Sequence, residues 1–168
     1  MSSMTGEQIC EDLDSYRDGG AAFEAILDRA VQRLHDSHPN FHWTGIYELF
    51  ADDVLRLGTF IGAPTDHVFI GVGQGVCGTA VAEKRNINVP DVSKVSNYLA
   101  CSTATKSELV VLIRMGDTIF AQIDVDSHEC NAFDATTVEH VERVAAWLAR
   151  EYARQRATVC GPAAPGRT

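Results

Sequence analysis

Two cysteines near the middle of the chain have surroundings in which a thiol could do chemistry. Cys101 follows Tyr98-Leu99-Ala100 and precedes small or hydroxyl-bearing residues, so a small substrate could approach its sulfur closely. Cys77 precedes Cys101 by 24 residues, inside the glycine-rich segment 71–84. Neither belongs to a CxxC pair or to zinc-ligand spacing. Such thiols are nucleophilic, redox-active or inert, and spacing alone favours the inert interpretation.

Three carboxylates belong to a predicted β-hairpin with strands at 108–115 and 118–127. Alternate residues of a strand share a face. One face of the second strand should therefore carry Ile119, Ala121, Ile123 and Val125, and the other face Phe120, Gln122, Asp124 and Asp126. The first set should bury against helices, which leaves two carboxylates about 6.5–7 Å apart on the second face.

The turn of the hairpin decides whether Glu108 joins these two acids. A two-residue turn at Gly116-Asp117 would place Glu108 opposite Val125, on the helix-facing side, where a carboxylate is costly. A three-residue loop at 115–117 would place it opposite Asp124. We predict the three-residue loop. Because like charges repel, carboxyl groups this close together favour one of them keeping its proton near neutral pH. A protonated carboxyl group can give that proton to an oxygen leaving group that is only weakly basic.

The alternative interpretation of these acids is purely structural. Asp124 and Asp126 could be solvated at the end of a strand, and Glu108 could pair with Lys106 or Arg114. Spacing alone slightly favours this alternative, because ion-pair networks are common without any catalytic role.

The remaining elements must position these residues. A helix is predicted over 23–34, separated from an earlier helical piece by Gly19-Gly20. Strands are predicted at 41–49, 54–61, 67–72 and 87–92, a short helix at 79–83, and a last helix capped by Asp134. Strand runs between terminal helices indicate an α+β domain with a mostly antiparallel sheet. The terminal helices should cover one face and the loops of 62–106, with a ligand pocket, the other.

The composition is that of an ordinary globular protein. The chain has 168 residues, 45% of them hydrophobic and 22% charged, which suffices for one well-packed domain. The net charge of −9 argues against nucleic acid and anionic membranes as partners. The sequence has neither an apolar stretch of roughly 20 residues nor a signal-peptide pattern, so we expect a cytoplasmic protein. Its five scattered cysteines fit reduced thiols better than structural disulfides.

Five motifs together point to one family: WTGIYEL (43–49), GVGQGVCGTAVA (71–82), VPDV (89–92), LACSTATKSELVV (99–111) and DVDS (124–127). On these motifs, over about residues 20–152, the chain resembles the GAF-domain free methionine-(R)-sulfoxide reductases. We therefore expect a GAF domain at 19–156, preceded by a helical segment at 1–18 and followed by a tail at 157–168, whose proline- and glycine-rich end predicts disorder. A homodimer is also expected, as is common for GAF domains.

The resemblance implies an oxidoreductase that reduces free L-methionine-(R)-S-oxide to L-methionine. Cys101 would be the nucleophile that attacks the sulfoxide sulfur and becomes a sulfenic acid. Cys77 would then form a disulfide with it, and external thioredoxin would reduce that disulfide. No metal and no bound cofactor are expected.

The same resemblance assigns the substrate-binding residues. Glu108, Asp124 and Asp126 would hold the substrate ammonium and polarise or protonate the sulfoxide oxygen, which gives Glu108 a catalytic role as well. Trp43 and Tyr47 would wall the pocket around the methyl group and the sulfur, because aromatic faces suit the partial positive charge on a sulfoxide sulfur.

Four departures from the family pattern lie around this site. Family members carry a further cysteine ten residues before the GVCG cysteine, where this chain has His67. The resolving thiol is therefore either Cys77 or an external thiol. Ser102 stands in place of an acidic residue, Asn97-Tyr98 in place of Gly-His, and Leu112 in place of proline.

A second hypothesis is a non-catalytic GAF module that senses a small ligand or thiol oxidation.

Overall fold

The computed structural model describes residues 3–99 and 103–159. Within these ranges the chain forms α1 (Gly6–Asp18), α2 (Phe23–Ser37), β1 (Trp43–Leu49), β2 (Val54–Ile61), β3 (Phe69–Gly71), α3 (Gly75–Glu83), β4 (Ile87–Val89), the 3-10 helix η1 (Val92–Lys94), β5 (Ser107–Met115), β6 (Thr118–Ser127) and α4 (Ala135–Val159). None of the described helices is long and apolar enough to cross a membrane.

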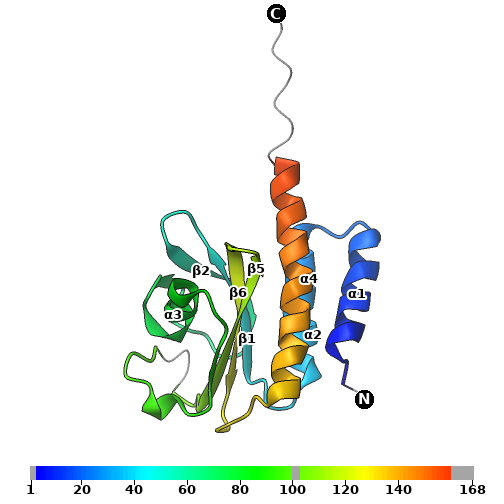
Figure 1. Cartoon of the computed structure of the whole chain (residues 1–168). Helices are drawn as coiled ribbons and strands as arrows, with labels where there is room; N and C mark the ends of the chain where they lie inside the picture. The colour runs from blue at the N-terminus through cyan, green and yellow to red at the C-terminus, as the bar shows by residue number, and fades with distance from the viewer. Residues whose placement is uncertain (1–2, 100–102, 160–168) are drawn as a thin grey trace, which may run out of the picture.

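The strands form one six-stranded sheet in the order β3-β2-β1-β6-β5-β4. Every neighbouring pair in it is antiparallel. Helices α1, α2 and α4 stand together on one side of this sheet, and α3 with the long loops lies on the other (Figure 1). The predicted α+β architecture, with the terminal helices on one face, is confirmed.

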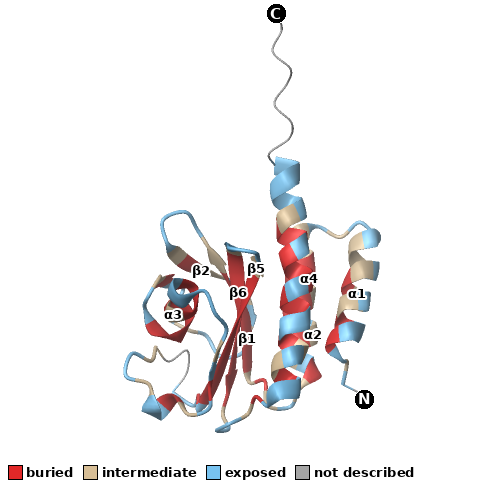
Figure 2. Cartoon of the chain, in the orientation of Figure 1, coloured by how far each residue is buried: buried red, intermediate tan, exposed pale blue. Residues whose placement is uncertain are grey.

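The strands at the centre of the sheet are largely buried (Figure 2), and an apolar cluster covers each face of the sheet. The helix-side core includes Ile9, Leu13, Leu34, Ile123, Val125, Val141 and Leu148. A smaller cluster on the opposite side includes Trp43, Tyr47, Leu55, Cys77, Ala80, Val110 and Leu112. Because both faces are covered, the polar side chains Gln122, Asp124 and Asp126 of the central strand β6 are withdrawn from water.

Most predicted elements are present, with differences at their ends. The last helix starts directly after Asp134, whose Oδ1 accepts a hydrogen bond from Thr137 N at 2.8 Å as predicted for a cap. The strand predicted at 87–92 ends at Val89, next to Pro90, which cannot donate to a ladder. The segment predicted as a tail, 157–168, is helical through Val159 and otherwise lies outside the described residues.

Helix α3 is longer than predicted and begins at Gly75 rather than at residue 79. It packs so closely on the preceding turn that a Cβ atom on Gly78 would collide with the carbonyl oxygen of Gly71. Close backbone contact explains this glycine, as expected for a tight strand-to-helix turn. The prediction that Cys77 lies in a loop is wrong, because this residue belongs to the first turn of α3.

Glu108 of the β5–β6 hairpin lies on the predicted face of the sheet, but the register that places it there differs from the predicted one. Its turn comprises only Gly116-Asp117, so the predicted three-residue loop is wrong. One additional residue, Phe120, bulges from β6 and shifts the pairing by one. Glu108 therefore lies opposite Asp126 instead of Asp124, still on the face away from the terminal helices.

The bulge also exchanges the faces predicted for two residues of β6. Phe120 packs on the helix side, where its ring stacks on that of Tyr152 of α4 with 5.8 Å between the centroids. Ile119 packs against the cluster on the other side. Beyond the bulge, from residue 121 onward, the predicted alternation holds.

Candidate active site

The sheet face below α3 forms the floor of the candidate site, and its polar residues lie in the neighbouring strands β6 and β5. Along β6 this floor carries Asp126, Asp124 and Gln122. Their neighbours in β1 are Trp43, Gly45 and Tyr47, respectively. Their neighbours in β5 are Glu108, Val110 and Leu112. The floor therefore has an acidic end at Asp126 and Glu108 and a neutral end at Gln122.

A thiol and two carboxyl groups meet between α3 and this floor. One donor atom from each of Cys77, Glu108 and Asp124 lies within 4.8 Å of the other two, and all three residues are buried. The Sγ of Cys77 donates to Oε1 of Glu108 at 3.7 Å. The structure thus brings the sequence-predicted acids together beside one of the two predicted cysteines.

The arrangement keeps a proton on Glu108. Its side chain is only 2% exposed. Burial, followed by the negative charges of Asp124 and Asp126, raises the pKa of Glu108 well above its ordinary value of 4.5. A carboxylic acid that stays protonated near neutral pH can act as a general acid.

The same three donors could also hold a metal ion. In the described ranges they form the one group of three or more histidine, cysteine or acidic side chains close enough to do so. A thiolate with two carboxylates would suit Zn²⁺. The expectation of a metal-free site therefore remains a prediction. His128 and Cys130 belong to no such group, and Cys130 is exposed.

Two buried aromatic side chains form one wall of the site. The rings of Trp43 and Tyr47 lie with their centroids 6.3 Å apart. Trp43 Nε1 donates to the carbonyl oxygen of Ala63 at 3.0 Å, and the hydroxyl of Tyr47 donates to that of His67 at 2.8 Å. These two hydrogen bonds attach the loop between β2 and β3 to the two aromatic side chains. His67 takes part through its backbone carbonyl.

The wall depends on a glycine beneath the indole. A Cβ atom on Gly45 would lie 2.5 Å from Trp43 Cη2 and 2.9 Å from Phe60 Cβ. Gly45→Ala should therefore displace the indole, lower the free energy of unfolding by about 1–3 kcal/mol and raise KM. Urea denaturation and steady-state kinetics measure these effects. Gly58→Ala is the matched control, because its Cβ would meet nothing closer than Ile46 O at 3.4 Å.

Cys101, the predicted nucleophile, lies outside the described residues. The described parts of its loop are attached to the site on both sides. Leu99 lies against the first turn of α3, where a Cβ on Gly75 would be 2.9 Å from Leu99 Cγ. Lys106 N donates to the carbonyl oxygen of Ser127 at 2.7 Å, at the end of β6.

Two further polar residues belong to the site, and the sequence pattern predicted no chemical role for either of them. Tyr98 lies close enough to the acids that burial, followed by the charges of Asp126 and Glu108, raises the pKa of its phenol. Gln122 is completely buried on the floor. The alternation along β6 places Gln122 on the correct face, but the sequence offers no sign that its amide is unusual.

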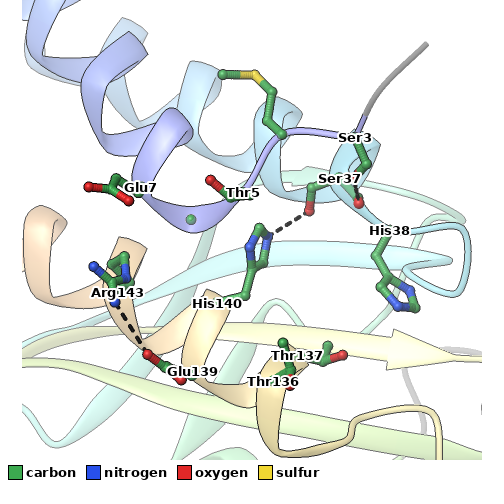
Figure 3. A pocket seen from close by; sticks show the side chains of 12 residues that line it. Ser3, Thr5, Glu7, Ser37, His38, Thr136, Thr137, Glu139, His140 and Arg143 are labelled. Carbon is green, nitrogen blue, oxygen red and sulfur yellow. Dashed lines mark hydrogen bonds and ion pairs between the residues drawn. The ribbon is translucent and has the colours of Figure 1, made fainter.

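A separate cavity of about 410 Å³ lies on the helical side of the sheet, between the starts of α1 and α4 and the end of α2 (Figure 3). Four of its polar side chains form two pairs. Ser37 Oγ lies 2.8 Å from His140 Nε2, and Arg143 forms an ion pair with Glu139 at 3.2 Å. Since its lining includes neither Cys77 nor an acid of the floor, the candidate chemistry lies elsewhere.

Comparisons with known proteins agree on one family. The GAF domain profile matches residues 22–152. The chain is 31% identical to the free methionine-R-sulfoxide reductase of Escherichia coli over 89% of this chain and 93% of that protein. The reduced fRMsr of Staphylococcus aureus superposes with a TM-score of 0.79 at 33% identity, covering 89% and 96% of the two chains. The Neisseria meningitidis free methionine-R-sulfoxide reductase, solved with its substrate, gives 0.80 at 27%, covering 90% and 91%.

Proposed function

The chain belongs to the GAF-domain free methionine-(R)-sulfoxide reductase family, and from this premise we propose that it reduces free L-methionine-(R)-S-oxide to L-methionine. The observation that carries the proposal is the buried contact of Cys77 with Glu108 beside Asp124. It combines a thiol with an acid that holds a proton, and reduction of a sulfoxide by thiols requires both.

In the first step the thiolate of Cys101 attacks the sulfoxide sulfur. The S–O bond of the substrate breaks and its oxygen is transferred to the Cys101 sulfur, so the substrate sulfur is reduced to a thioether and Cys101 is oxidised to a sulfenic acid. The oxygen must be protonated as it leaves the substrate sulfur. Glu108 is the proposed donor, because its raised pKa keeps the proton available near neutral pH.

In the second step the Cys77 sulfur attacks the sulfenic sulfur of Cys101. A disulfide forms, water leaves, and external thioredoxin reduces the disulfide to regenerate both thiols. Glu108 is left as a carboxylate by the first step, and across the 3.7 Å contact it accepts the Cys77 proton and passes it to the leaving oxygen, which departs as water. Glu108 regains its own proton after the disulfide is reduced, when the restored Cys101 thiol ionises again to the thiolate.

The floor and the wall supply the proposed substrate contacts. Asp124 and Asp126 would attract the ammonium group, since both are buried carboxyl side chains at the acidic end of the floor. Trp43 and Tyr47 would surround the methyl group and the sulfur. We place the reaction in the cytoplasm, where thioredoxin maintains reduced thiols.

We also propose a homodimer, in which the exposed apolar side chains at the β2–β3 edge would be covered. Phe69 is 66% exposed there, and Val68 and Phe60 are 42% and 38% exposed. Large exposed apolar side chains are candidates for an interaction surface. Sedimentation velocity tests the dimer, and a monomer at micromolar concentration would contradict it.

The deciding experiment is turnover of separated sulfoxide diastereomers. With thioredoxin, thioredoxin reductase and NADPH, we expect NADPH consumption with the R form of free methionine sulfoxide and none with the S form. Methionine formation should match NADPH consumption one to one. A folded, fully reduced protein that turns over neither form would overturn the proposal and favour a ligand-sensing module.

A further inference from the structure

The side-chain amide of Gln122 is buried at the neutral end of the floor. Its exposed fraction is 0%, and neither Nε2 nor Oε1 has a hydrogen-bond partner among the described residues. The register places it between Tyr47 of β1 and Leu112 of β5, two residues from Asp124 on the same strand face.

An unpaired amide in such a place is unfavourable in the ligand-free protein. Its surroundings are the cluster below α3, which is otherwise composed of apolar and aromatic side chains such as Tyr47, Ala80 and Leu112. Withdrawal of an amide from water without a replacement partner destabilises a fold. A methionine of the same length would fill this space without that penalty.

The donors of the adjoining wall are already engaged. Trp43 Nε1 donates to Ala63 and the Tyr47 hydroxyl donates to His67. At the other end of the floor Glu108 is the proposed proton donor, whereas an ionised aspartate attracts cations and repels the partially negative oxygen of a sulfoxide. Gln122 Nε2, in contrast, carries N–H groups at every pH.

A sulfoxide differs from its thioether product by a single strong acceptor, the oxygen. Trp43 and Tyr47 are the proposed contacts of the sulfur end of the substrate, and Gln122 is the register neighbour of Tyr47. These proposed contacts place the sulfur end of the bound substrate beside the amide of Gln122.

We propose that Gln122 Nε2 donates a hydrogen bond to the sulfoxide oxygen of the bound substrate and thereby distinguishes the sulfoxide from methionine. This inference rests on the proposed function. Gln122 orients the S–O bond next to the acid that protonates it, and the bond to Gln122 is lost when the oxygen leaves, which favours release of methionine.

Affinity for substrate and product tests this role directly. Isothermal titration calorimetry measures the binding of methionine-(R)-sulfoxide and of methionine. The protein with Gln122 and the Gln122→Met variant both carry Cys101→Ser, so the sulfoxide is not reduced during the titration. Gln122→Met should weaken sulfoxide binding about tenfold and leave methionine binding unchanged. Equal sulfoxide affinity in both proteins would overturn the inference. Absence of sulfoxide binding to the Cys101→Ser protein itself would instead overturn the proposed function.

Stability separates a binding role from a structural one. If Gln122 serves a ligand, Gln122→Met should raise the midpoint of thermal unfolding of the ligand-free protein, because the unpaired amide is removed. A lowered midpoint would show that the amide supports the fold, against the inference. Gln122→Leu repeats the test with a second apolar side chain. Gln32→Met, at an exposed site on α2, is the matched control and should change neither binding nor stability.

Discussion

Cys101→Ser is expected to abolish turnover of free methionine-(R)-sulfoxide, with kcat reduced by at least about a thousandfold. A serine hydroxyl is a far weaker nucleophile than a thiolate and cannot form a sulfenic acid. Thioredoxin-coupled NADPH oxidation measures the loss. The variant should still bind the sulfoxide, so calorimetry distinguishes lost chemistry from lost structure.

Two further variants make this expectation specific. Cys77→Ser should reduce one equivalent of sulfoxide per protein and then stop, because the sulfenic acid has no internal thiol to resolve it. Cys130→Ser is the control, since that thiol is exposed and does not belong to the group formed by Cys77, Glu108 and Asp124, and it should keep full activity. Sustained turnover by Cys101→Ser would show that another thiol is the nucleophile.

Glu108→Gln should lower kcat by about 10²–10⁴-fold with a much smaller effect on sulfoxide binding. Glutamine retains the shape of the protonated acid but has no proton to deliver to the leaving oxygen. In the wild type the rate should decline as pH rises through the raised pKa of Glu108. A pH–rate profile checks this, and the declining limb should be absent from the residual activity of the variant.

The same substitution should change the pH dependence of stability. Folding raises the pKa of Glu108, so between its ordinary value of 4.5 and the raised value the folded protein holds a proton that the unfolded chain releases. The free energy of unfolding therefore falls with rising pH through this window, by at most about 1.4 kcal/mol per pH unit from this group.

Glu108→Gln removes this dependence, so its stability relative to wild type should grow from pH 5 to pH 8. Urea denaturation at several pH values measures the difference. Glu129→Gln, at an exposed position that follows β6, is the control and should track the wild type. A constant difference between Glu108→Gln and wild type across this range would mean that Glu108 is ionised in the folded protein.

Much of this molecule could be predicted from local pattern. The strand at 54–61 and the helix cap at Asp134 appear as predicted, because strand alternation and side-chain capping depend on neighbours in the chain. The choice of Glu108 and Asp124 for one face followed from the cost of burying a carboxylate against apolar helices. Glu108 does lie on the predicted face, although the hairpin turn has two residues instead of the predicted three.

Residue patterns are enough to predict the fold class, the family motifs and the shared face of Glu108, Asp124 and Asp126, because these follow from periodicity and residue chemistry. Other features of the site come from contacts that the pattern does not contain. A bulge at Phe120 set the partner of Glu108, and close backbone packing at Gly78 allowed α3 to include Cys77. The unpaired amide of Gln122 appears only once α3 covers the sheet. Each of these depends on contacts between distant segments, which local propensity does not encode.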